Sequence, residues 1–114
     1  MERTITPTDL QTLLSAGKPI SLLDVRRAEA RAKEPVAIPG AIWRDPAALD
    51  DWISDLDAGR QIILYCVHGE EISNAVVDAL QAKSLRARFV KGGLDAWQAV
   101  GGPVESCDRG QDRA

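Results

Sequence analysis

Residues that bind metals or form disulfides are scarce in this chain. Its 114 residues include one histidine and two cysteines, Cys66 and Cys107, which lie far apart in the sequence. A closed zinc site needs four ligands, so a metal centre is not expected. In a reducing compartment we also expect no structural disulfide between the two cysteines.

Long apolar runs and a strong excess of one charge are also missing. No run of about 18 apolar residues occurs, so no membrane-spanning segment is predicted. The first residues, MERTITPTDL, lack the apolar core of a secretory signal, and we therefore expect a cytoplasmic protein. A net charge of -3 argues against nucleic acid or an anionic membrane as the main partner.

The chain is long enough for one domain, and apolar strand-like runs alternate in it with helices that are apolar on one side. Strand signals cover residues 19–25, 61–66 and 86–90, and helix signals cover residues 5–19, 44–60, 70–84 and 91–102. Residues 26–37 suit a short helix or excursion, and residues 38–43 suit a turn into a brief extended piece. This alternation predicts an α/β domain with a largely parallel sheet covered by helices on both faces. We assign residues 1–105 to the domain and residues 106–114, a polar segment, to a flexible tail.

Cys66 stands where the strand-like run QIILYC meets the next expected helix. In open α/β sheets ligands bind beyond the carboxyl ends of the strands, which places Cys66 on one rim with residues 24–27 and 91–93. Unpaired backbone N–H groups and the positive end of a helix dipole favour a thiolate, a persulfide anion or an oxyanion there. The alternative is a small buried residue that completes the strand, since free cysteine is among the most buried residue types.

Three short blocks give the chain a family resemblance. They are LLDVR (residues 22–26), IPGAI (residues 38–42) and KGGLDAWQAVGGPV (residues 91–104). With these blocks spaced around a strand-borne cysteine, the chain resembles the rhodanese-like single-domain sulfurtransferases over roughly residues 4 to 105. The glycine–histidine pair that often precedes the second block in that family is Val36–Ala37 here.

The resemblance implies a rhodanese-like fold, with a central parallel sheet of five strands flanked by helices on both faces. It implies that Cys66 takes a sulfane sulfur from a donor, holds it as a persulfide and passes it to a thiophilic acceptor. The donor would be a small sulfur compound or a persulfidated protein, and the acceptor a thiol or a protein. No metal and no organic cofactor is implied. The loop that cradles the persulfide would comprise Val67, His68, Gly69, Glu70, Glu71 and Ile72.

The loop after Cys66 departs from the family pattern in its charge. The family's loop commonly runs from the cysteine through four residues to an arginine, and Glu71 occupies the place of that arginine. Two unit charges about 6 Å apart at an effective dielectric of roughly 20 interact by about 3 kcal/mol, so a glutamate there disfavours the thiosulfate dianion. Alternatively, Glu70 and Glu71 are first-turn residues that complement the helix dipole and lean outward. His68 is either a proton carrier beside the thiolate or an exposed loop residue, and the second reading is favoured.

Positive side chains near the same rim offer a replacement for the missing arginine. We hypothesise that one of Arg27, Arg44 or Lys91 supplies the charge. The alternative for each is a solvated side chain, and for Arg26 an ion pair with an acidic neighbour. The three tryptophans are expected in the core or at its edge, because their spacing suggests no ligand cage.

Three functions are compatible with these residues. The first is a sulfurtransferase that works through a Cys66 persulfide, with thiosulfate a doubtful donor. The second is a non-catalytic rhodanese-like module that binds a partner, or senses an oxidant or oxyanion, through Cys66. The third, a phosphatase or arsenate reductase, is the weakest, because such loops are usually longer and need the arginine to hold a tetrahedral oxyanion.

Overall fold

The structure is a computed structural model, and it describes residues 3–67 and 71–106 of the chain. A five-stranded parallel sheet runs through its centre in the order β1-β6-β5-β2-β4. In that order the strands are Thr4–Ile5, Ala87–Val90, Gln61–Tyr65, Ile20–Asp24 and Ile42–Trp43. The parallel α/β architecture expected from the sequence is confirmed.

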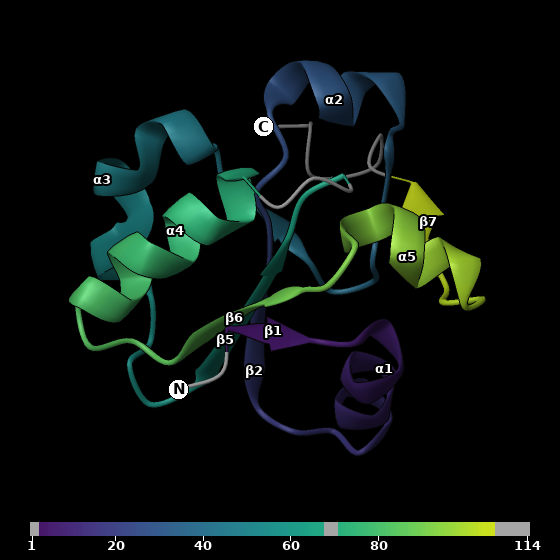
Figure 1. The fold of residues 1–114 in the computed structure, drawn as a ribbon, viewed down its shortest axis with the longest axis horizontal. Helices are drawn as coiled ribbons and strands as arrows, with labels where there is room; N and C mark the ends of the chain where they lie inside the picture. Colours follow the sequence, from purple (N-terminus) through teal and green to yellow (C-terminus); the bar gives the residue numbers. More distant parts are fainter. Residues whose placement is uncertain (1–2, 68–70, 107–114) are drawn as a thin grey trace.

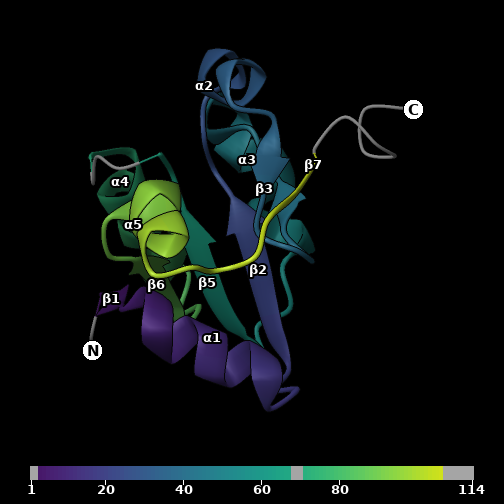
Figure 2. The ribbon, with the colours of Figure 1, turned by 90° about the vertical axis from the view of Figure 1, so that its right-hand side faces the viewer.

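Helices cover both faces of this sheet, as Figure 1 shows. On one face lie α1 (Pro7–Ser15) and α5 (Gly93–Ala99), and on the other lie α3 (Leu49–Trp52) and α4 (Glu71–Ala82). A further helix, α2 (Ala28–Lys33), stands beyond the end of β2. Figure 2 shows the molecule from the side on which α1 and α5 face the viewer. The carboxyl ends of the central strands therefore meet the loops that lead into α2, α4 and α5.

The alternation of side chains along β5 divides the core into two clusters. Ile62 and Leu64 belong to the cluster under α3 and α4, whereas Ile63 and Tyr65 belong to the cluster under α1 and α5. All four of these side chains are fully buried. Because successive strand residues point to opposite faces, a slip of one residue in register would exchange the two clusters. The register of β5, and with it the position of Cys66, is therefore fixed from both faces.

Two expected helix starts are confirmed by side-chain caps, but one expected helix is broken. Thr6 Oγ1 accepts the N–H of Asp9 at 3.1 Å, and Asp45 Oδ1 accepts the N–H of Ala47 at 2.9 Å. The prediction of one continuous helix within residues 44–60 is wrong. A 3₁₀ turn η1 (Pro46–Ala48), the single α-turn of α3 and a second 3₁₀ turn η2 (Ile53–Asp55) take its place. The indole N–H of Trp52 bonds the Asp45 carbonyl at 2.8 Å, which ties these short turns together.

Three short strands go beyond the expected elements. β1 pairs with β6 and forms one edge of the central sheet. Of its two residues, the sequence pattern places Ile5 in the first helical segment. β3 (Val36–Ala37) pairs in antiparallel fashion with β7 (Glu105–Ser106) and forms a separate two-stranded sheet. Residue 106, the first of the expected tail, thus lies in β7, and Cys107 lies outside the described residues.

Candidate functional site

Cys66 directly follows β5 and is 5% exposed. Its sulfur accepts a hydrogen bond from the hydroxyl of Ser73 on α4, with Oγ and Sγ 3.2 Å apart. Ser73 is itself 1% exposed, so this hydroxyl is held away from bulk water against the sulfur. Ser73 was not among the predicted site residues. Its position in the sequence could have indicated it. Ser73 lies three and four residues before the buried Val76 and Val77, a spacing that places its hydroxyl on the inward side of the helix.

The amino-terminal end of α5 holds the backbone that carries Cys66. The N–H of Leu94 bonds the Cys66 carbonyl at 2.8 Å, and the N–H of Asp95 bonds the Val67 carbonyl at 3.0 Å. The first N–H groups of a helix have no acceptor within the helix, and here the two loop carbonyls serve as their acceptors. Gly93, at φ 64, allows the close approach, because a Cβ atom there would lie 2.5 Å from the Cys66 oxygen. Gly93 of the third sequence block therefore allows α5 to position the cysteine loop.

A pocket of about 170 Å³ opens beside Cys66. Its walls come from the cysteine loop, the start of α4 and the loop between β2 and α2. The lining residues are Arg26, Arg27, Ala30, Cys66, Val67, Glu71 and Ile72. Five residues proposed from the sequence, Arg27, Cys66, Val67, Glu71 and Ile72, thus line one pocket. His68, Gly69 and Glu70 lie outside the described residues.

Glu71 satisfies both interpretations of its position. It is the first residue of α4 and is exposed, as expected for a carboxylate that complements a helix dipole. It also lines the Cys66 pocket, so its charge lies on the surface that an anionic ligand would approach. Among the residues that the structure describes, the pocket lining therefore carries one exposed anion, Glu71, and one exposed cation, Arg27.

Arg26 also lines this pocket, but its guanidinium is buried and bonds other groups of the protein. It forms a bidentate ion pair with Asp24, with Nη2 and Oδ2 2.7 Å apart, and both side chains are buried. The two Nη atoms also donate to the carbonyls of Glu34 and Val36 at 2.9 and 2.8 Å. The buried Asp24–Arg26 pair of the first sequence block thus connects the end of β2 to the backbone that leads into β3. It confirms the ion-pair reading of Arg26.

Tyr65 completes this buried network. Its hydroxyl donates to Asp24 Oδ2 at 3.3 Å and accepts the N–H of Ile38 at 3.2 Å. Burial raises the pKa of the Tyr65 phenol, and the neighbouring Asp24 carboxylate raises it further. The Tyr65 phenol therefore keeps its proton to a higher pH than an ordinary tyrosine does. Through its two hydrogen bonds Tyr65 links the first and second sequence blocks.

The other two proposed cations lie apart from the pocket lining. The Arg44 guanidinium lies over the Trp52 ring, 5.9 Å from its centroid, a contact that attracts a cation to the ring face. Lys91 is exposed after β6, where its N–H bonds the Ile5 carbonyl at 2.9 Å. Of the three candidates, Arg27 is the one that lines the pocket of Cys66.

The tryptophans lie where the sequence suggested. Trp52 and Trp97 are buried, at 5% and 0% exposure, and Trp43 is partly exposed with its indole N–H bonded to the Arg26 carbonyl. Within the described residues, no three His, Cys, Asp or Glu side chains gather in a way that would hold a metal ion. No helix in this part of the chain has the length and apolar character to cross a membrane.

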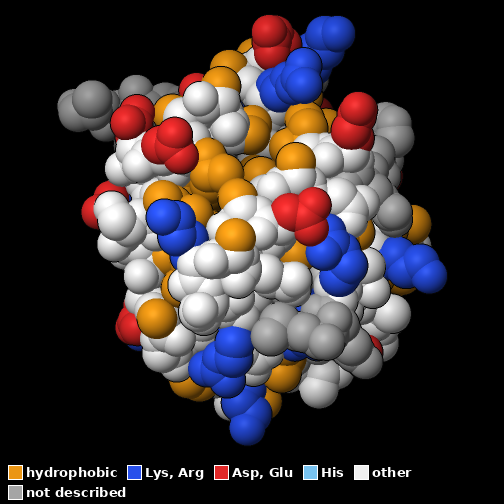
Figure 3. Space-filling view, turned by 60° about the vertical axis from the view of Figure 1, so that its left-hand side comes forward, with side chains coloured by type: hydrophobic (Ala, Val, Ile, Leu, Met, Phe, Trp, Pro, Cys, Tyr) orange, Lys and Arg blue, Asp and Glu red, His pale blue; other side chains and the backbone are white. Residues whose placement is uncertain are grey.

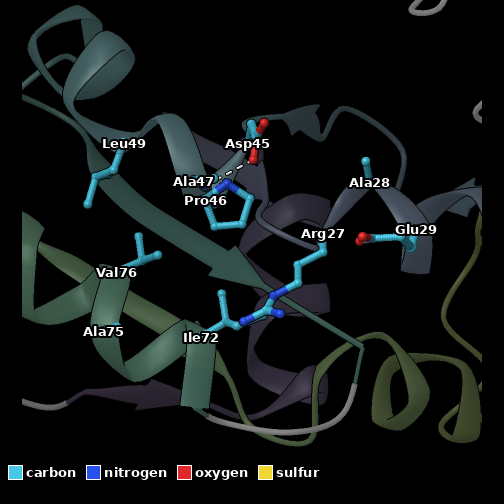
Figure 4. Close-up of a pocket in the computed structure, with 10 residues that line it drawn as sticks. All are labelled: Arg27, Ala28, Glu29, Asp45, Pro46, Ala47, Leu49, Ile72, Ala75 and Val76. Carbon is cyan, nitrogen blue, oxygen red and sulfur yellow. Dashed lines mark hydrogen bonds between the residues drawn. The ribbon is translucent and has the colours of Figure 1, made fainter.

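A second, wider groove of about 520 Å³ adjoins the Cys66 pocket. Arg27 and Ile72 line both cavities, so these two side chains form the boundary between them. Figure 4 shows the groove between α2, the turn η1 with α3, and the first turns of α4. Figure 3 shows the face on the α3–α4 side, where hydrophobic side chains lie in a hollow bordered by charged ones.

The fold and the rim cysteine define an α/β protein that presents a thiol at the carboxyl end of a parallel sheet. The rhodanese-like domain family model matches residues 6–100. The chain belongs to this family, as its three sequence blocks suggested. The comparison with curated proteins found no match.

Solved structures agree with this assignment. A full-length protein from Lactobacillus plantarum is 26% identical, with a TM-score of 0.82, and the match covers 90% of this chain and 87% of that one. A rhodanese-related protein from Thermoplasma volcanium is 27% identical, with a TM-score of 0.78 and coverage of 90% and 97%. The rhodanese-like domain of an Anabaena protein is 31% identical, with a TM-score of 0.79 and coverage of 100% and 86%.

Proposed function

We propose that this protein is a sulfurtransferase that carries a sulfane sulfur on Cys66. The observation that carries the proposal is the pocket in which Cys66 meets the Ser73 hydroxyl and two opposite exposed charges, in a chain of the rhodanese-like family. The hydroxyl donates to the sulfur and favours its anionic form, which is the nucleophile in this chemistry. The proposal includes a cytoplasmic location, where Cys66 remains a free thiol.

The transfer consists of two displacements at sulfur. In the first, the Cys66 thiolate attacks the outer sulfur of a donor R–S–SH. A new S–S bond forms, the donor's S–S bond breaks, and RS⁻ leaves with the electron pair, so that Cys66–S–SH retains the proton. In the second, an acceptor thiolate attacks the outer sulfur of Cys66–S–SH, and the Cys66 thiolate is regenerated. The transferred sulfur keeps its oxidation state, so neither step consumes an oxidant or a reductant.

The charges of the pocket select among donors. An arginine at position 71 would attract a dianion, whereas Glu71 repels it, and Arg27 offsets this repulsion. Two exposed charges about 6 Å from a ligand contribute about 1 kcal/mol each once solvent screening lowers the Coulomb value. Replacing an attractive by a repulsive side chain therefore costs the binding of thiosulfate on the order of ten- to a hundredfold. A polysulfide or a persulfidated protein, whose reactive end carries less charge, is the preferred donor.

A single-turnover experiment tests this function. Protein is treated with polysulfide, with thiosulfate or with a persulfidated protein donor, desalted, and mixed with cyanide, and the thiocyanate formed is measured. We expect about one equivalent per protein after polysulfide, little after thiosulfate, and none from Cys66→Ser. Glu71→Arg should raise loading from thiosulfate by ten- to a hundredfold and leave loading from polysulfide nearly unchanged. Equal loading of the wild-type protein by thiosulfate and polysulfide contradicts the role of Glu71. No thiocyanate after any donor contradicts the enzyme and favours a non-catalytic module that binds a partner or senses an oxidant.

A further inference from the structure

The groove beside the Cys66 pocket is larger than sulfur transfer between small inorganic compounds requires. The pocket of about 170 Å³ already holds room for the outer sulfur of a persulfide. The adjoining groove adds about 520 Å³, a size typical of sites for organic ligands. Its floor is apolar: Leu49 and Ile72 are half-buried and pack against the core, and Val76 is 3% exposed. An apolar body, rather than an inorganic anion, is complementary to such a floor.

Among the described residues, the charged side chains that line the groove are Arg27, Glu29 and Asp45. Of these three, Arg27 is the one that also lines the Cys66 pocket, so the positive charge lies at the end nearest to Cys66. In Figure 4 its side chain extends across the groove toward Ile72. No hydrogen bond or ion pair joins the Arg27 guanidinium to a side chain in the described parts of the chain. An exposed guanidinium in this position is free to bind a carboxylate in a bidentate manner. A ligand in the groove would thus place a carboxylate beside the reactive sulfur and its apolar body farther out.

We propose that this groove binds the sulfur acceptor, and that the acceptor is an organic thiol with a carboxylate close to its sulfur and an apolar body. The carboxylate binds Arg27, and the body lies over Leu49, Ile72 and Val76. The bound thiol loses its proton to solvent, and its thiolate attacks the outer sulfur of Cys66–S–SH. A bond forms between the acceptor sulfur and the transferred sulfur, and the S–S bond to Cys66 breaks. The acceptor leaves as a persulfide that keeps the proton of Cys66–S–SH, and Cys66 keeps the electron pair as a thiolate. The transfer step rests on the proposed sulfurtransferase activity, but the binding does not.

Binding is tested first, with probes that cannot accept sulfur. N-hexanoyl-L-serine carries the carboxylate and an apolar chain, and its hydroxyl replaces the thiol. N-acetyl-L-serine lacks the chain, and N-hexanoyl-L-serinamide lacks the carboxylate. In titrations followed by the amide shifts of the protein, we expect N-hexanoyl-L-serine to bind about tenfold more tightly than either comparison probe.

Two pairs of variants locate the site. Arg27→Gln should weaken binding of N-hexanoyl-L-serine about tenfold, while Arg60→Gln, which removes an exposed arginine at the opposite end of β5, should not. Ala75→Leu places a larger side chain in the groove from an exposed position of α4 and should abolish binding. Ala82→Leu makes the same change at the exposed last residue of α4 and should have no effect. Equal binding of the three probes, or equal effects within either variant pair, overturns the proposal, as does an absence of binding by N-hexanoyl-L-serine.

Transfer is tested on protein loaded with polysulfide and desalted. N-hexanoyl-L-cysteine should remove the sulfur from Cys66 about tenfold faster than N-acetyl-L-cysteine at equal concentration, and Ala75→Leu should remove this difference. Equal rates overturn the acceptor role, even where the serine probe binds. If no donor loads Cys66, the sulfurtransferase proposal fails on its own, and the acceptor role fails with it, while the titrations still decide whether the groove binds a carboxylate with an apolar body.

Discussion

Gly93→Ala tests whether α5 positions the cysteine loop. The substitution adds a Cβ atom 2.5 Å from the Cys66 oxygen and 2.6 Å from the Val67 oxygen, where ordinary contacts begin at 3.4 Å. The loop or α5 must therefore move by almost 1 Å, which weakens the bonds from Leu94 and Asp95 to these two carbonyls. Overpacking of this kind costs about 1–3 kcal/mol. The positive φ of 64 costs a further 1–2 kcal/mol, roughly, for any residue with a Cβ atom.

Gly17→Ala is the matched control for this change. Gly17 has a similar φ of 70, but a Cβ atom there would meet nothing within 4 Å. It should cost only the conformational penalty of about 1–2 kcal/mol. For a domain of this size each kcal/mol lowers the midpoint of thermal unfolding by roughly 4–8 °C, so Gly93→Ala should unfold about 10 °C below Gly17→Ala. Sulfur loading by polysulfide should fall more than tenfold in Gly93→Ala and remain normal in Gly17→Ala. Equal midpoints and equal loading rates in the two variants would refute the positioning role of α5.

Three further changes probe the buried contacts of the site. Ser73→Ala removes the hydroxyl that donates to the Cys66 sulfur, so alkylation of Cys66 by iodoacetamide should need a higher pH. The circular dichroism spectrum should stay unchanged. An identical pH profile of alkylation in the two proteins would exclude a role of Ser73 in stabilising the thiolate. Arg26→Met leaves the buried Asp24 carboxylate without its partner and should lower the free energy of unfolding in urea by about 3–5 kcal/mol. Arg60→Met removes an exposed ion pair and should lower it by less than about 1 kcal/mol. Similar losses in the two variants would contradict the structural role of the Asp24–Arg26 pair. The raised pKa of Tyr65 means that the folded state holds the phenol proton more tightly than the unfolded state does. The resulting stabilisation is complete below the ordinary pKa of 10.0 and is lost as the pH rises above that value. Tyr65→Phe should therefore flatten the alkaline decline in the free energy of unfolding, and an unchanged decline would contradict this role of Tyr65.

Features set by neighbouring residues could be predicted from the sequence. Thr6 and Asp45 are followed by proline and cap the segments expected after them. The run that ends at Cys66 is apolar and forms the central strand of the sheet. The ion pair of Arg26 was foreseen as an alternative because an acidic residue lies two positions away. These features depend on local preferences and short-range contacts, which a sequence displays directly.

Features that depend on packing between distant segments could not be predicted. The two residues of β1 form a strand only because they pair with Phe89 and Val90. The choice among the three candidate cations depends on the path of the loop after β2, which brings Arg27 to the pocket. The groove exists because η1 and α3 stand apart from α4, a spacing that no pattern in either segment encodes.

The most direct test of the account is the intact mass of the protein after treatment with polysulfide and desalting. We predict a gain of one sulfur atom that is lost on addition of a dithiol, that persists in Cys107→Ser, and that is absent from Cys66→Ser. A protein that gains no sulfur, or that gains it equally in Cys66→Ser, would contradict the claim that Cys66 carries the transferred sulfur.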